Sequence, residues 1–227
     1  LLHMITSDPQ RTPTLTMFAL ADYFVHTGPP ACGVQAPCVA EAPGFAWDHG
    51  SVSPDINTTW LGLVGPGVRQ LGVDGGVWSD HTDVRPTILE LASLQDDYAD
   101  DGRVLVEVLQ PSALSPSLRG QLDTYLALAR AYKEIDAPVG PVGLASLAIS
   151  TKALASGSAR NDAIFTVFEA QLADITARRD SLASQMSALL NGAAFGGGGI
   201  GFGPSLSLEG QAEALRIRVE ALAVAGG

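Results

Sequence analysis

Residues 45–103 read FAWDHGSVSPDINTTWLGLVGPGVRQLGVDGGVWSDHTDVRPTILELASLQDDYADDGR and decide the expected fold of this 227-residue chain. Their apolar run Thr59–Val64 is continuous and stops at Gly65-Pro66-Gly67, a combination that predicts a buried strand. A second apolar run, Thr14–Phe24, is rich in residues that favour strands and predicts another strand entering a loop.

A helix is predicted over Asp83–Leu94, shortly after the Gly-Pro-Gly turn. Asp83 can cap its first turn, and Pro86 falls where its missing N–H costs little. The predicted inner face consists of Ile88, Leu89, Leu91 and Ala92. Strand, loop and helix in alternation predict an α/β layered domain over residues 1–110.

Residues 111–227 show helical periodicity and no strand pattern. Helices are predicted over Ser115–Ile135, around Val142–Ala155, over Asn161–Leu190 and over Leu208–Leu222. The last two should pair as an antiparallel hairpin across the loop at Gly192–Pro204. In the longest helix Arg179 is the one break in an apolar series spaced by three and four residues. The sequence thus predicts an all-α helical extension after the α/β domain.

The composition is acidic and excludes some classes of partner. Asp and Glu number 24 against 13 Lys and Arg, for a formal net charge of −11. Nucleic-acid binding needs clustered basic residues, so no nucleic-acid-binding patch is expected. No apolar run approaches the roughly 18 residues that span a bilayer, so no transmembrane segment is expected.

The two cysteines and the start of the chain bear on its compartment. Cys32 and Cys38 bracket a short Pro/Gly/Ala loop, which suits a disulfide in an exported protein. Two reduced thiols, or two thiolates on zinc, are the alternatives. Leu1 is no initiator and no signal peptide precedes the first apolar run, so a truncated N-terminus is expected.

His49 is the first candidate for chemistry. It lies in Asp48-His49-Gly50, where Trp47 anchors the segment and Gly50 permits a tight turn behind the ring. A lone histidine is more often structural than a ligand, so the pattern alone leaves both roles open. Asp48 is adjacent and is expected to support the site rather than to bind the metal directly.

A second polar group, Asp80, His81 and Asp83, lies in WSDHTDVRP. It could form a local metal site, but carboxylates at a helix N-terminus are also favoured by free N–H groups and the helix dipole, and that interpretation is preferred. The acidic run QDDYADDG at 95–102 lacks the spacing of an EF-hand loop and predicts a solvated turn.

Four pieces of this sequence, in order and spacing, resemble the C-terminal part of the alkaline phosphatase superfamily, in the nucleotide pyrophosphatase/phosphodiesterase-like branch. The pieces are Asp8-Pro9-Gln10-Arg11-Thr12-Pro13, Asp48-His49-Gly50, Thr59–Val68 and Asp83–Leu89. The resemblance covers roughly the first half of the chain. The helices after residue 110 lie outside it.

The resemblance implies a metal-dependent phosphoester hydrolase with two divalent metal ions, commonly zinc, and a phosphoester small molecule as substrate. His49 matches a histidine ligand of that two-metal site. The nucleophile and the other ligands lie upstream in such enzymes, so no catalytic residue is expected in this chain, which alone should be inactive. An extracellular or cell-envelope location is implied as well.

The alternative belongs to another class of protein. The chain could be a non-catalytic exported interaction module that presents its helical hairpin to a partner. In either case, the helical extension is expected to pack on a catalytic domain or on a partner.

Overall fold

The computed structural model of the protein describes residues 8, 10–13, 16–20, 23, 25, 43–44, 51–95, 98–154 and 160–225. The chain divides into two compact units, Thr6–Gly62 and Leu63–Gly227 together with Leu1–Ile5. In the first unit the described residues include one short helix, α1 (Pro54–Asn57). The second unit holds the remaining described helices and is the one that matters for the site.

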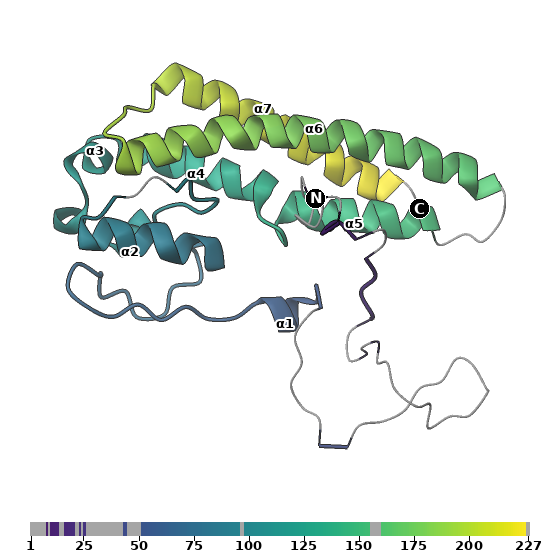
Figure 1. Ribbon diagram of the computed structural model, residues 1–227, viewed down its shortest axis with the longest axis horizontal. Coiled ribbons are helices and arrows are strands. Elements are labelled where there is room, and N and C mark those ends of the chain that lie inside the picture. Colours follow the sequence, from purple (N-terminus) through teal and green to yellow (C-terminus); the bar gives the residue numbers. More distant parts are fainter. Residues whose placement is uncertain are drawn as a thin grey trace. The chain divides into compact units, whose positions relative to one another are not determined.

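A helical bundle makes up most of the second unit (Figure 1). Its members are α4 (Leu122–Asp136), α5 (Pro141–Leu154), α6 (Arg160–Phe195) and α7 (Phe202–Ala225). The helices α6 and α7 form the predicted antiparallel hairpin, and α4 and α5 both pack against it. At 1.5 Å per residue the 36 residues of α6 extend roughly 54 Å. The helical prediction after residue 110 is confirmed.

Shorter elements precede the bundle. A 3₁₀ turn, η1 (His81–Asp83), leads directly into α2 (Val84–Ala92). Two further 3₁₀ turns, η2 (Val106–Val108) and η3 (Pro111–Ala113), connect to the short helix α3 (Pro116–Arg119). These elements share the core of the bundle, because Val104, Val106 and Leu109 are buried in the same cluster as Tyr125 and Leu128.

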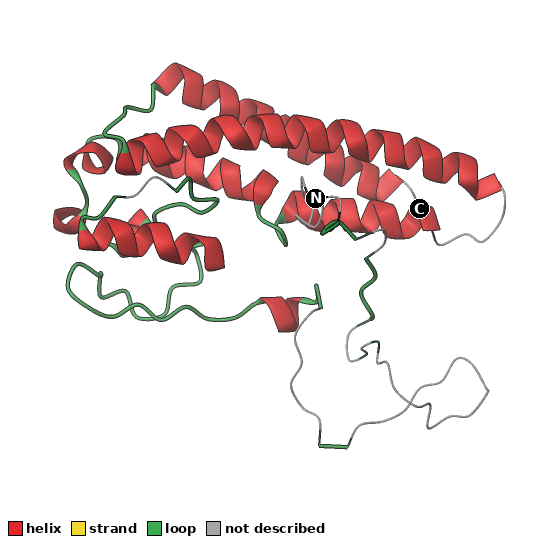
Figure 2. Ribbon diagram, viewed as in Figure 1, coloured by secondary structure: helices red, strands yellow, loops and turns green. Residues whose placement is uncertain are grey.

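The predicted α/β layered domain is wrong for the described part of the chain, which holds no sheet (Figure 2). There the one β-bridge pairs Val68 with Leu109. Thr59–Val64 has no regular secondary structure, and Trp60 and Val64 are 88% and 100% exposed. An apolar run becomes a buried strand only where neighbouring strands accept and donate its backbone hydrogen bonds.

The turn and the helix that follow that run are both present. Val68 N–H donates to Gly65 O at 3.2 Å, and Gly67 has a φ of +83°, a conformation that favours glycine. The predicted inner face of α2 is only partly right, however, because Leu91 packs against the core whereas Ala92 is exposed. Ile88 is 54% exposed, whereas Pro86, Thr87 and Glu90 are the buried residues of this helix.

Polar contacts explain why α2 buries that face. Thr87 Oγ1 donates to Asp83 O at 2.7 Å and accepts from Leu105 N–H at 3.0 Å. Glu90 accepts a hydrogen bond from the backbone N–H of Ser115. Buried polar atoms with partners are tolerated in a core, so the direction of α2 is set by its hydrogen bonds as much as by its apolar side chains.

Candidate functional site

A buried charge cluster joins η1 to the bundle, and its core is formed by Asp80, Asp83, Arg103, Glu107 and Lys133. The local sequence explains its first part. Asp80 Oδ1 accepts from Thr82 N–H at 2.9 Å, and Asp83 Oδ2 accepts from Asp80 N–H at 3.1 Å. This reciprocal arrangement is a capping box, which satisfies N–H groups at the start of a helix.

Lys133 of α4 supplies the cation that faces both carboxylates. Its Nζ lies 2.8 Å from Asp83 Oδ1, 3.0 Å from Asp80 Oδ2 and 3.0 Å from Thr82 Oγ1. Asp83 is fully buried and Lys133 is 5% exposed. Burial acts to raise the pKa of the Asp80 carboxyl, but Lys133 and the hydrogen bonds from Thr82 outweigh it and hold that pKa below its ordinary value of 3.8.

Arg103 closes the cluster from the other side. Its backbone N–H donates to Asp83 Oδ1 at 2.9 Å, its Nη1 lies 2.7 Å from Glu107 Oε2, and its Nη2 donates to Trp78 O at 2.9 Å. Burial opposes the charge, yet Glu107 and Asp83 more than compensate and raise the pKa of the Arg103 guanidinium. The loop before η2 is thereby fixed to the start of α2.

Tyr125 lies beneath this cluster and completes a backbone contact. Its hydroxyl accepts from Val104 N–H at 2.9 Å, and the side chain is fully buried. Burial raises the pKa of the Tyr125 hydroxyl well above its ordinary value, so the group remains neutral at physiological pH. The ring therefore serves as a neutral hydrogen-bonding support under Val104.

A neighbouring group ties the same region to α6. Asp100 pairs with Arg85 of α2, and Asn191 Nδ2 of α6 donates to Asp100 O at 3.0 Å. Arg85 also lies over the ring of Tyr98, 4.8 Å from its centroid. Contacts from α2 and from α6 thus hold the loop at 98–103 in place.

The geometry assigns an anchoring role to this cluster. The carboxylates of Asp80 and Asp83 already face an ammonium, so a divalent cation between them would have to displace Lys133 against charge repulsion. His81 lies beside them and is exposed. Among the residues that the structure describes, no group of three or more His, Cys, Asp or Glu side chains could hold a metal ion.

The other predicted site residues lie outside the described residues. These are Asp48 and His49, together with the cysteines Cys32 and Cys38. The metal-ligand role of His49 and the disulfide stay predictions.

Sequence reasoning missed Lys133 and Arg103, although a signal for Lys133 existed. It follows the buried Ala129 by four residues and therefore lies on the apolar face of α4, where a lysine needs a buried partner. Arg179 likewise interrupts the apolar face of α6 with a charged side chain. Its Nη1 lies 3.2 Å from Asp136 Oδ1.

The chain matches no protein-family model, no curated protein and no solved structure. None of the described helices combines the length and apolarity required of a membrane span.

Proposed function

We propose that this chain is part of a metal-dependent phosphoester hydrolase similar to the alkaline phosphatase superfamily, to which it contributes the metal ligand His49. One observation carries the proposal. Four sequence motifs resemble that superfamily in their order along the chain, and the second of them contains the Asp48-His49-Gly50 turn. The third, Thr59–Val68, supports the proposal by its sequence alone, because Thr59–Val64 forms no strand. An imidazole nitrogen is a suitable zinc ligand, so the donor chemistry of His49 fits.

The buried charge cluster supports a division of roles between the two Asp-His motifs. Asp80 and Asp83 are engaged by Lys133 and by backbone N–H groups, so the motif Asp80-His81-Thr82-Asp83 anchors α2 on the bundle. We assign the metal to the other motif, Asp48-His49-Gly50, on the sequence resemblance alone. Asp48 would support the His49 imidazole, and bound zinc would polarise a phosphoryl oxygen.

The test uses the intact protein, with the upstream region in which the nucleophile and remaining ligands are expected. His49→Ala should lower both the zinc content, measured by mass spectrometry of the metal, and the hydrolysis of bis(p-nitrophenyl) phosphate. His81→Ala is the matched control, since it removes the histidine of the other Asp-His motif, and it should retain both. Unchanged zinc content in His49→Ala would contradict the proposal.

The 227-residue chain gives a second test on its own. It should not hydrolyse the same diester at any zinc concentration, because phosphoryl transfer by two metals needs a full ligand set and an in-line nucleophile. Zinc-dependent turnover that disappears in His49→Ala would show that the chain carries a complete site. Such a result would refute the view that it supplies a single ligand.

A further inference from the structure

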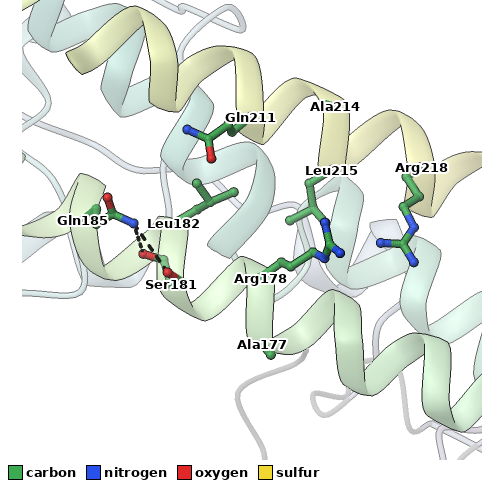
Figure 3. Close-up of a pocket in the computed structure, with 9 residues that line it drawn as sticks. All are labelled: Ala177, Arg178, Ser181, Leu182, Gln185, Gln211, Ala214, Leu215 and Arg218. Carbon is green, nitrogen blue, oxygen red and sulfur yellow. Dashed lines mark hydrogen bonds between the residues drawn. The ribbon is translucent and has the colours of Figure 1, made fainter.

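A groove of about 510 Å³ runs between α6 and α7 on the helical hairpin (Figure 3). Its base contains Leu182 and Leu215, which are 7% and 5% exposed. Exposed Ala177, Ser181 and Ala214 also line it. Side chains at these positions are short, so the groove lies open above the two leucines, which themselves show only a small part of their surface.

The two ends of the groove differ in charge, as Figure 3 shows. Gln185 and Gln211 line one end, and Arg178 and Arg218 line the other. Both arginines pair with one carboxylate, because Arg178 Nε lies 3.1 Å from Asp174 Oδ1 and Arg218 Nη1 lies 2.8 Å from Asp174 Oδ2. The hydrogen bonds from Arg218 and Arg178 hold the pKa of Asp174 below its ordinary value, so that carboxylate is charged.

Two guanidinium groups against one carboxylate leave this end with a net positive charge. The arginine side chains are 63% and 41% exposed and carry further N–H groups in a planar fork suited to carboxylates. No acidic residue is among those that line the groove. In a chain with a net charge of −11, this is a local inversion of sign.

We propose that this groove binds an acidic amphipathic helix of a partner protein. The lined part of α7 extends from Gln211 to Arg218, which corresponds to roughly two helical turns at 3.6 residues per turn. Apolar side chains of the partner would cover Leu182 and Leu215, and its Asp or Glu residues would pair with Arg178 and Arg218. Such helix-in-groove recognition uses anchors spaced by three and four residues. The proposal does not depend on the hydrolase assignment.

Charge also argues against a second copy of this chain as the occupant. If two grooves faced each other in antiparallel orientation, the arginine end of each would cover the glutamine end of the other. The guanidinium groups would then lose water without gaining a carboxylate, which is unfavourable. In parallel orientation, arginine would face arginine.

The test compares two synthetic amphipathic peptides that share one Leu/Ala stripe and differ only in carrying Glu or Lys on the polar positions. Fluorescence anisotropy with the 227-residue chain should show that the Glu peptide binds at least tenfold more tightly than the Lys peptide. The affinity should fall as salt rises, because the pairs are exposed. Equal affinity for both peptides, or binding of neither, would overturn the proposal.

Variants locate the binding. The double change Arg178→Glu and Arg218→Glu should reverse the preference between the peptides, and Ala214→Trp should weaken Glu-peptide binding at least tenfold by filling the groove. Arg119→Glu, an exposed arginine on α3, should leave the affinity unchanged. All four substituted positions are exposed, and circular dichroism verifies that each of the three variants is folded. A dimer in sedimentation velocity that Ala214→Trp abolishes would assign the groove to a second copy and refute the proposal.

Discussion

The Nζ atom of Lys133 lies 2.8 Å from Oδ1 of Asp83, and the two side chains are 5% and 0% exposed. This pair connects the first turn of α2 to the middle of the bundle. A charge buried to this extent needs a partner, because the protein interior replaces its hydration poorly. Together with the contacts of Arg103 to Asp83 and Trp78, the Lys133–Asp83 pair holds the segment before α2 on the bundle.

Lys133→Met should lower the free energy of unfolding by about 3–5 kcal/mol, the range observed when one partner of a buried ion pair is removed. Asp83 would remain buried without its cation, and Asp80 would lose the same partner. Urea unfolding followed by circular dichroism at constant pH measures the change.

Lys152→Met is the matched control for that experiment. Lys152 is partly buried in α5 and donates to the backbone oxygen of Ala223, but it faces no buried carboxylate in the described part of the chain. Lys152→Met should lower the free energy of unfolding by less than about 2 kcal/mol. If both variants lowered the free energy of unfolding equally, the Lys133–Asp83 pair would contribute no more to stability than the Lys152 side chain does.

Asp80 gives the bundle a predictable response to acid. Its pKa in the folded protein lies below 3.8, so its contribution to stability is present above that pH and is lost as the pH falls through the folded value. Between pH 5 and about pH 3, the wild-type free energy of unfolding should therefore decline more steeply than that of Asp80→Asn.

Denaturant unfolding at several pH values measures this. Asp123→Asn is the control, because Asp123 is exposed. The difference in free energy of unfolding between wild type and Asp80→Asn should become smaller as the solution is acidified. A gap of constant size over the whole range would contradict the assignment to Asp80.

The helices after residue 110 could be predicted because their signal is local. Apolar residues in α6 recur every three or four positions, and Ile175, Leu182 and Met186 are buried as that spacing requires. The same spacing includes Ile164, yet this side chain is 46% exposed. Periodicity identifies a face of a helix but does not tell how far the neighbouring helices cover it.

The buried charge cluster could be predicted only in part. The capping box uses Asp80 and Asp83, three residues apart, and is visible in the sequence. The partner Lys133 lies on another helix, and only the packing of α4 brings it to the cluster. For the same reason the sequence predicts only part of the inner face of α2. Thr87 and Glu90 are buried there because their hydrogen-bond partners are the distant residues Leu105 and Ser115.

We predict that Cys32 and Cys38 form a disulfide where the protein meets an oxidising compartment, because they bracket a short loop in the sequence and such compartments retain these bonds. Mass spectrometry of the non-reduced protein after alkylation would then find neither thiol modified. Two alkylated cysteines in protein isolated from its native compartment would contradict the prediction.

Two glycines should respond to alanine with opposite signs. A Cβ at Gly102 would overlap the carbonyl of Thr82, whereas one at Gly210 would meet no atom within 4 Å. Gly102 directly precedes Arg103, whose N–H binds Asp83 at 2.9 Å, so the absence of a side chain lets the loop approach η1. Gly102→Ala should destabilise by about 1–3 kcal/mol through overpacking.

Gly210→Ala should instead stabilise by about 0.5–1 kcal/mol, because Gly210 is exposed within α7 and alanine has the higher helix propensity. Thermal unfolding by circular dichroism at one scan rate compares both variants with wild type. The melting temperature should fall for Gly102→Ala and rise for Gly210→Ala. If Gly102→Ala melted at or above the wild-type temperature, the loop would not need its close approach to Thr82, and the path that carries Arg103 to Asp83 would have to be different.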